Sequence, residues 1–249
     1  MAKLKSLIKI EGTLDDLTFY KGKEGYLVRR KGGVNRDRIN NDPAFIRTRE
    51  NGTEFGHSAT AGKILRRAIV PLLSSAKDNT IVARLVKVMS LVKNEDTTSV
   101  RGQRKVHIGL TTNEGKAYFK GFDFNSKATL SSVLLTEFAL DTATGQIDIT
   151  GVIPNQNVVA PPGATHVSFT AGFLNLDFET EESELILSPK VNTPINGSSS
   201  NVTLTPVSVP QGTGNQFYFL QLEFFQEINS VQYQLNNGTY NVLTIIEIL

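Results

Sequence analysis

The residues that could carry out chemistry in this chain are few and widely separated. The chain has three histidines, His57, His107 and His166, and no cysteine. Zinc sites place their ligands a few residues apart, and these histidines have no such spacing. The sequence also lacks the Gly-x-Ser-x-Gly segment that presents a serine nucleophile. These patterns indicate no metal centre and no catalytic set, so we expect a non-enzymatic protein without a cofactor.

A segment rich in small residues, from Gly56 to Lys63, has some features of a phosphate-binding loop. That loop needs four residues between its glycines and a Ser or Thr after the lysine. In this chain five residues separate Gly56 from Gly62, and Ile64 follows Lys63. We therefore interpret Gly56, Ala59 and Gly62, which are spaced by three, as positions where another backbone can come close.

An acidic cluster lies late in the chain and could provide oxygen ligands for Ca²⁺. Its members are Asp177, Glu179, Glu181, Glu182 and Glu184. The spacing and the glycine of a helix-loop-helix calcium site are absent. The pattern therefore favours a solvated turn between two strands, with Ca²⁺ as the alternative.

The charges of the chain are divided between its two parts. The net charge is +2. Residues 1–105 contain 22 Lys and Arg against 11 Asp and Glu, a net charge of +11, whereas residues 106–249 contain 4 against 13, a net charge of −9. Such an asymmetry predicts a basic surface for an acidic partner. The partner is either nucleic acid or the acidic part of a neighbouring copy, in a head-to-tail contact.

The cations that could form this basic surface lie in two stretches. They are Arg29, Arg30, Lys31, Arg36, Arg38, Arg47, Arg49, Lys63, Arg66 and Arg67. Proteins that bind single-stranded nucleic acid interleave such cations with aromatic residues, and only Phe45 is near in the sequence. The pattern favours a solvated linker in which the arginines pair with nearby acids, namely Asp37, Asp42, Glu50 and Glu54.

Two consecutive helices are predicted, at about 43–76 and 79–93. Asp42 and Pro43 form a good helix start. Apolar residues from Leu65 to Ala76 then follow the spacing of one helical face. Pro71 interrupts this face and predicts a kink or a break, because proline lacks the N–H that an inner helical turn needs.

The remaining segments have β-type patterns. Residues 4–31 predict a small antiparallel meander, which is too small to be stable alone and should pack on another layer or another subunit. Residues 106–249 predict an antiparallel β-sandwich of the jelly-roll or immunoglobulin type, with strands from Val106 onward. The apolar alternation of residues 165–178 changes parity after Phe173, which predicts a β-bulge there. The segment from Asn236 to Gly238 predicts a hairpin.

The fold class is therefore α+β and mostly β, with a basic region at 1–105 and an acidic β-sandwich domain at 106–249. Three segments inside residues 20–105 resemble parts of small uncharacterised proteins of Bacteroidota. They are Phe45 to Asn51, Glu54 to Gly56 and Lys63 to Ala68. No established activity comes with this resemblance, so it implies no site residues.

The compartment is left open by the sequence. Lys9 and Glu11 interrupt the apolar residues near the start, so no signal peptide is recognisable. No run of 18 apolar residues occurs, and we expect no membrane span. Cytoplasmic synthesis is expected, followed by assembly into a particle or an exported structure.

We expect a self-assembling structural protein that forms a homo-oligomeric shell, tube or filament, of phage-like or cell-surface origin. Contacts between the basic N-terminal region and the acidic C-terminal region would build it. One alternative is a nucleic-acid-associated protein that uses the basic region. Another is a surface adhesin or carbohydrate-binding β-sandwich, against which the absence of tryptophan counts.

Overall fold

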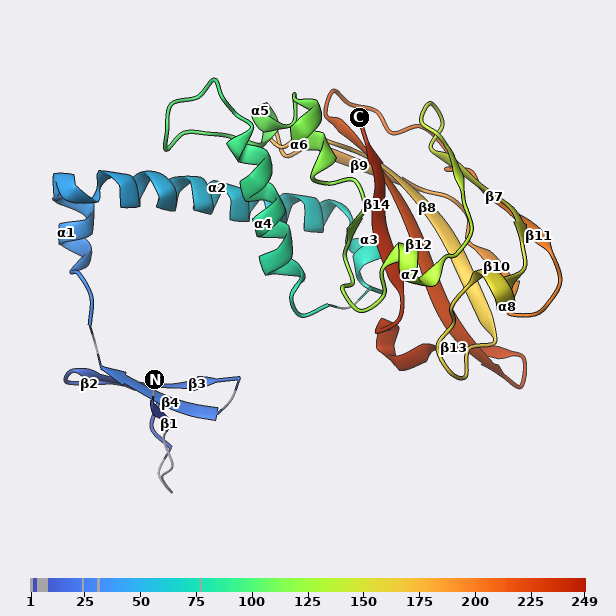
Figure 1. The fold of residues 1–249 in the computed structure, drawn as a ribbon, viewed down its shortest axis with the longest axis horizontal. Coiled ribbons are helices and arrows are strands. Elements are labelled where there is room, and N and C mark those ends of the chain that lie inside the picture. Colours follow the sequence, from blue (N-terminus) through green and yellow to red (C-terminus); the bar gives the residue numbers. More distant parts are fainter. Residues whose placement is uncertain (1, 4–8, 24, 31, 77) are drawn as a thin grey trace. The chain divides into compact units, whose positions relative to one another are not determined.

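The computed structural model describes residues 2–3, 9–23, 25–30, 32–76 and 78–249 (Figure 1). The protein is a mixed, mostly β structure with two compact units, Met1–Arg49 and Glu50–Leu249. The division predicted at residue 105 falls inside the second unit. There the helices of residues 50–105 share one apolar core with strands from the end of the chain.

The first unit contains an antiparallel sheet with the strand order β1-β4-β3-β2. Its strands are β1 (Ala2–Lys3), β2 (Gly12–Leu14), β3 (Leu17–Gly22) and β4 (Gly25–Arg30). The predicted small antiparallel sheet is confirmed. Its first predicted strand falls largely on residues 4–8, which lie outside the described residues.

Two short helical elements link this sheet to the long helix that follows. The elements are α1 (Arg36–Asn41), the 3-10 helix η1 (Pro43–Phe45) and α2 (Ile46–Ala68). The Asp42 carboxylate accepts a hydrogen bond from the Ala44 N–H at 2.9 Å, and Pro43 occupies the first helical position. The capping role predicted for these two residues is therefore present, although they cap η1, and α2 begins directly after it.

The predicted break at Pro71 is confirmed. Helix α2 ends at Ala68, and α3 (Val70–Leu73) begins after Ile69, with Pro71 near its start. The next helix, α4 (Ile81–Asn94), begins after Asp78, whose carboxylate accepts hydrogen bonds from the N–H and the hydroxyl of Thr80. These helices form the predicted helical pair.

The prediction of strands directly after Val106 is wrong. This part of the chain forms two short helices, α5 (Val106–Gly109) and α6 (Asn113–Ala117). A side chain at Gly109 would collide with the backbone carbonyl of Val92 in α4, and one at Gly115 would collide with the carbonyl of Gly109. The glycines therefore allow close helix packing, which local apolar patterns do not reveal.

Two antiparallel sheets make up the rest of the second unit. The larger has seven strands in the order β10-β8-β12-β14-β5, with β13 paired to β12 and β9 paired to β8, and the smaller has the order β11-β7-β6. The strands are β5 (Phe122–Asp123), β6 (Ala139–Asp141), β7 (Gln146–Val152), β8 (His166–Leu176), β9 (Ser183–Leu187), β10 (Val191–Pro194), β11 (Ser200–Leu204), β12 (Asn215–Ile228), β13 (Val231–Gln234) and β14 (Val242–Ile248). Short helices lie between them at α7 (Leu130–Val133), α8 (Pro154–Asn157) and η2 (Leu235–Gly238).

The large sheet is the middle of three layers (Figure 1). Its first face, with Phe217, Phe219 and Ile245, packs against the helices in one core. Its second face, which includes Phe169 and Tyr218, packs against the three-stranded sheet β11-β7-β6 in a second core. The second core is that of the predicted β-sandwich.

Polar side chains of the large sheet also hold the helical layer. Gln221 is buried and donates a hydrogen bond from Nε2 to the Leu72 carbonyl at 2.8 Å. Asn241 is also buried and donates from Nδ2 to the Ser75 carbonyl at 3.0 Å. These bonds tie the large sheet to the backbone at the end of α3 and just after it.

The β-bulge predicted near Phe173 is wrong. Strand β8 pairs regularly with β12 from Leu176 to His166. The parity change arises because β8 is buried on both faces: Phe173 belongs to the second core, and Leu174 belongs to the first. The register of the large sheet instead shifts between Tyr218 and Phe219, where β12 pairs with β14.

The predicted hairpin at Asn236 to Gly238 is also wrong. Strands β13 and β14 both pair with β12, and residues 235–238 form η2. The true hairpin joins β12 to β13 through Asn229 and Ser230, which have φ values of 52° and 64°. Gly238 also has a positive φ, and a side chain there would collide with the Ser75 carbonyl. Its glycine thus serves packing against the helical layer.

We predict opposite effects of alanine at two helical glycines. Gly109→Ala should lower the free energy of unfolding by at least about 2 kcal/mol, because α4 and α5 must separate. Gly56→Ala, at a position of α2 with nothing within reach of the new methyl group, should raise it by about 0.5–1 kcal/mol. Urea unfolding followed by circular dichroism measures both. Equal effects at the two positions would contradict the packing described here.

Candidate functional site

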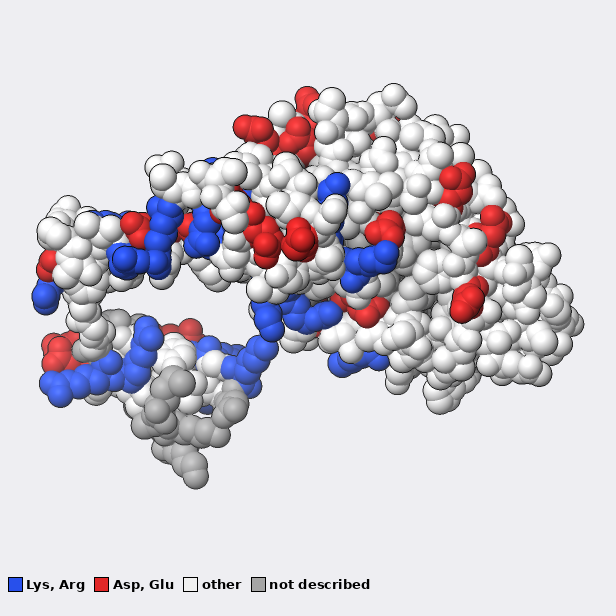
Figure 2. All heavy atoms as spheres, turned by 45° about the horizontal axis from the view of Figure 1, so that its top comes forward, with Lys and Arg blue, Asp and Glu red and all other residues white. Residues whose placement is uncertain are grey.

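The predicted cations are divided between the two units. Arg29 and Arg30 lie on β4, Arg36 and Arg38 on α1, and Arg47 and Arg49 at the start of α2, all within the first unit. Lys63, Arg66 and Arg67 lie on the C-terminal half of α2, in the second unit. Lys31 lies outside the described residues. Figure 2 shows Lys and Arg side chains gathered over the small sheet and the start of α2.

Two of these arginines hold the local structure together. Arg49 donates from Nη1 to the carbonyls of Ile39 and Asp42, at 2.7 and 3.1 Å, and so ties α1 to α2. Arg38 forms an ion pair with Asp42 at 3.0 Å. The Ala44 N–H and the Arg38 guanidinium lower the pKa of Asp42. The Arg38–Asp42 pair agrees with the predicted pairing, whereas Glu50 and Glu54 pair with Arg101 and Arg104, outside the predicted set. The bonds to backbone carbonyls make Arg49 a structural residue.

Other cations of the first unit lie over aromatic rings. Arg29 lies 5.5 Å from the centre of the Tyr20 ring, and Lys9 lies 5.4 Å from that of Tyr26. Strand pairing produces this arrangement, since Tyr20 and Arg29 are nine residues apart in sequence. The sequence analysis, which found only Phe45, missed it.

The N-terminal sheet carries an apolar face that the described residues of its unit cover only in part. By register, Leu14 is opposite Leu17 and Phe19 is opposite Val28, while Tyr26 is opposite Lys21. Residues directly opposite each other point to the same face. Leu14, Leu17, Phe19, Tyr26 and Val28 thus form one surface, which we call the apolar sheet face. None of residues 9–23, 25–30 and 32–49 is buried, and Leu14 is 63% exposed.

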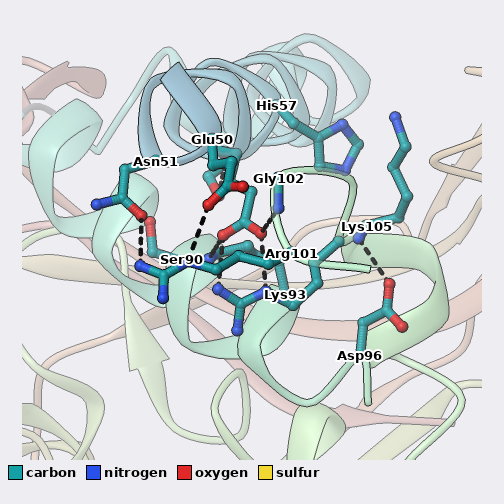
Figure 3. A network of polar contacts seen from close by, with 12 residues as sticks. Glu50, Asn51, His57, Ser90, Lys93, Asp96, Arg101, Gly102 and Lys105 are labelled. Atoms are coloured by element: carbon teal, nitrogen blue, oxygen red, sulfur yellow. Dashed lines mark hydrogen bonds and ion pairs between the residues drawn. The ribbon is translucent and has the colours of Figure 1, made fainter. Parts of the chain in front are cut away.

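The strongest electrostatic cluster surrounds a residue that the sequence analysis had treated only as a pairing partner. Glu54 on α2 is 2% exposed and accepts hydrogen bonds from the Gly102 N–H at 2.8 Å and from Lys93 Nζ. Arg104 donates to both of its carboxylate oxygens, from Nε at 2.8 Å and from Nη2 at 2.7 Å. Figure 3 shows the surrounding network of polar contacts, in which Lys93 and Gly102 are labelled. The Arg104 guanidinium and the Lys93 ammonium lower the pKa of Glu54 to about 2, against the effect of burial.

A second buried carboxylate holds the loop that carries Arg104. Asp96 accepts hydrogen bonds from the N–H groups of Thr98, Ser99 and Lys105, at 3.1, 2.9 and 2.9 Å. Burial alone would raise the pKa of Asp96, but the hydrogen bonds from Ser99 and Lys105 outweigh it and lower the pKa. Residues 97–105, which resemble a linker in sequence, are therefore fixed to α2 and α4.

His57 on α2 also holds this part of the chain in place. Its Nε2 accepts a hydrogen bond from the Val106 N–H at 2.9 Å, and burial lowers the pKa of its imidazole. Glu50 extends the cluster outward through an ion pair with Arg101 at 3.3 Å. These groups join α2, α4 and the loop, so the cluster supports the fold.

The acidic cluster of residues 177–184 forms a turn after β8. The Asp177 carboxylate accepts hydrogen bonds from the N–H groups of Glu179 and Thr180, at 2.7 and 3.2 Å. Within the described ranges, no group of three or more His, Asp or Glu residues is arranged to hold a metal ion. Nor does any described helix combine the length and the apolar character that crossing a membrane requires.

Comparison with known proteins adds no relative. No protein-family model, no curated protein and no solved structure matches the chain.

We predict that Glu54→Gln lowers the free energy of unfolding by about 3–5 kcal/mol, because it leaves the buried charges of Lys93 and Arg104 uncompensated. Glu50→Gln, one turn earlier, breaks only a partly exposed ion pair and should cost less than about 1 kcal/mol. Urea unfolding at neutral pH compares them. Equal losses would contradict the role of Glu54.

The same carboxylate should make stability depend on pH. Its pKa is lowered on folding from 4.5 to about 2, so its contribution is complete above 4.5 and is lost as the pH falls toward 2. The shift corresponds to about 3 kcal/mol. Between pH 4.5 and about pH 2, the free energy of unfolding should fall more for the wild-type protein than for Glu54→Gln. Urea unfolding at several pH values measures this, and parallel plots of unfolding free energy against pH would contradict the lowered pKa.

Proposed function

We propose that the chain is a non-enzymatic, self-assembling structural protein that builds a homo-oligomeric shell, tube or filament, phage-like or on a cell surface. Contacts between the basic N-terminal region of one copy and the acidic C-terminal region of the next hold the assembly together. The observation that carries this proposal is the small N-terminal sheet, in which no residue of β2, β3 or β4 is buried.

The energetics of this sheet support a need for a partner. A small sheet gains independent stability by burying one face against another layer. Each large apolar side chain that becomes buried contributes about 1.5–3 kcal/mol. Leu14 is 63% exposed and Leu17 is 42% exposed, while Phe19, Tyr26 and Val28 are half-buried, so part of this stabilisation is still to be gained. A partner that covers the apolar sheet face would supply it.

The distribution of charge supports a second copy as that partner. Residues 1–49 have a net charge of +6 and residues 50–249 a net charge of −4. Lys93 and Arg104 pair with Glu54 inside residues 1–105, and Lys190 pairs with Glu223 inside residues 106–249. Because each of these ion pairs lies within one region, none of them reduces the charge difference between residues 1–105 and residues 106–249. A contact between unlike regions of identical chains is head-to-tail, and it produces a ring or a filament.

The engagement of the buried acids supports a non-enzymatic protein. Glu54, Asp78 and Asp96 each accept several hydrogen bonds from structural groups, and the pKa of each is lowered. A general acid or base works best with a pKa near the operating pH. These carboxylates are instead ionised structural anchors.

We predict that charge reversal in the basic region impairs assembly. Arg36→Glu with Arg47→Glu changes two exposed side chains of the first unit and should shift the protein toward monomers in light scattering and negative-stain images. Lys87→Glu with Lys127→Glu makes the same change in charge at exposed positions of the second unit and should leave assembly intact. A wild-type protein that stays monomeric at high concentration and low salt would overturn the proposal.

Nucleic-acid binding is a second candidate, favoured by the cation–aromatic pairs of Tyr20 with Arg29 and of Tyr26 with Lys9. Aromatic rings next to cations are what single-stranded nucleic acid requires. This candidate predicts that an oligonucleotide binds at low salt, that affinity falls steeply as salt rises, and that Tyr20→Ala weakens binding. Fluorescence anisotropy measures this, and the absence of binding at low salt would exclude it.

A further inference from the structure

Cations border the apolar sheet face, and one of them, Arg30, forms an ion pair with Asp16 of the β2–β3 turn at 3.6 Å. Register places Lys21 and Arg30 on the same face as Tyr26 and Leu17, since Lys21 is opposite Tyr26 and Arg30 is opposite Leu17. Lys9 lies over the Tyr26 ring. A surface that fits this face must therefore be apolar at its centre and acidic at its edge.

The second unit has a surface with these two properties. Val207 is 75% exposed and Val209 is 39% exposed, on the segment between β11 and β12. Pro206 and Pro210 beside them are buried, and the Val207 N–H bonds to the carbonyl of Leu187 in β9. The segment is therefore fixed at both ends, and the two valines project from it.

Acidic residues border these valines. Glu184 on β9 accepts a hydrogen bond from the Gln211 N–H, which places its carboxylate beside the valine segment. Next to it is a hollow of about 130 Å³ lined by residues that include Asp177, Glu182 and Glu184. Glu182 and Glu184 are exposed. We call Val207, Val209, Glu182 and Glu184 the valine–acidic surface.

Electrostatics favour this surface over a second small sheet as the partner of the apolar sheet face. Two first units, each with a net charge of +6, would repel each other in a symmetric sheet-to-sheet contact. The valine–acidic surface offers the opposite charge together with exposed apolar groups. Both properties match what the sheet face presents.

We infer that the apolar sheet face of one copy packs against the valine–acidic surface of the next copy, with its Lys and Arg side chains facing Glu182 and Glu184. This inference rests on the proposed function and names the two surfaces that meet. It makes the contact between copies head-to-tail.

The absence of cysteine allows a direct test by disulfide cross-linking between full-length variants. Leu17→Cys in one protein and Val207→Cys in another place thiols on the two surfaces. Mixed at low salt under mild oxidation, they should form a disulfide-linked heterodimer. Thr18→Cys, on the opposite face of the same strand, is the matched control and should link to Val207→Cys several-fold more slowly.

Three results would overturn the inference. Leu17→Cys could link mainly to itself, which would mean a symmetric contact. Thr18→Cys could link as fast as Leu17→Cys. The variant with both cysteines could close within one chain instead of forming oligomers. If light scattering still shows assembly after one of these results, the inference fails and the proposed function stands. If the protein is monomeric, both the inference and the proposed function fail.

Substitutions of the valine–acidic surface provide a second test. Val207→Asp should weaken assembly, whereas Leu135→Asp, at a residue 58% exposed elsewhere on the second unit, should not. Glu182→Lys should weaken it as well, with Glu137→Lys as the control of equal charge change at another exposed site. Light scattering compares the four variants, and assembly that is equally strong in all of them would overturn the inference.

Discussion

The structure of the second unit depends on one constraint, the burial of strands β8 and β12 on both faces. Their side chains alternate between two apolar cores, so neither face can meet water. Helices cover one face of the large sheet, and the three-stranded sheet β11-β7-β6 covers the other. Hydrogen bonds from the buried side chains of Gln221 and Asn241 also tie the large sheet to the backbone at the end of α3. The Glu54 cluster then fixes the loop that completes the helical layer.

The sheet of the first unit also has apolar side chains to bury, and the described residues of this unit bury them only in part. Its sheet presents leucine, valine and aromatic side chains, yet no residue of β2, β3 or β4 is buried. The cations of the chain are concentrated in its first part, since 22 of the 26 Lys and Arg residues lie in residues 1–105. The partly covered apolar face of this sheet and the divided charge of the chain are the two features on which the proposed head-to-tail assembly rests.

Features set by local sequence could be predicted, and features set by close packing could not. The helix start at Asp42 and the break at Pro71 follow from single residues, and the β-rich second half follows from its turns. The short helices after Val106 depend on the contact between Gly109 and Val92, which no local pattern contains. The change of parity after Phe173 has two explanations in sequence, a bulge or burial of both faces, and only the packing decides between them. The partners of Glu54 lie 39 to 50 residues away, so spacing could not reveal them.

Sedimentation velocity of the wild-type protein, over a range of protein and salt concentrations, tests the central claim most directly. If the basic sheet of one copy completes itself on the acidic region of another, species larger than the 27.3 kDa chain should form at low salt and dissociate as salt screens the contact. A single species of 27.3 kDa under all conditions would contradict the account.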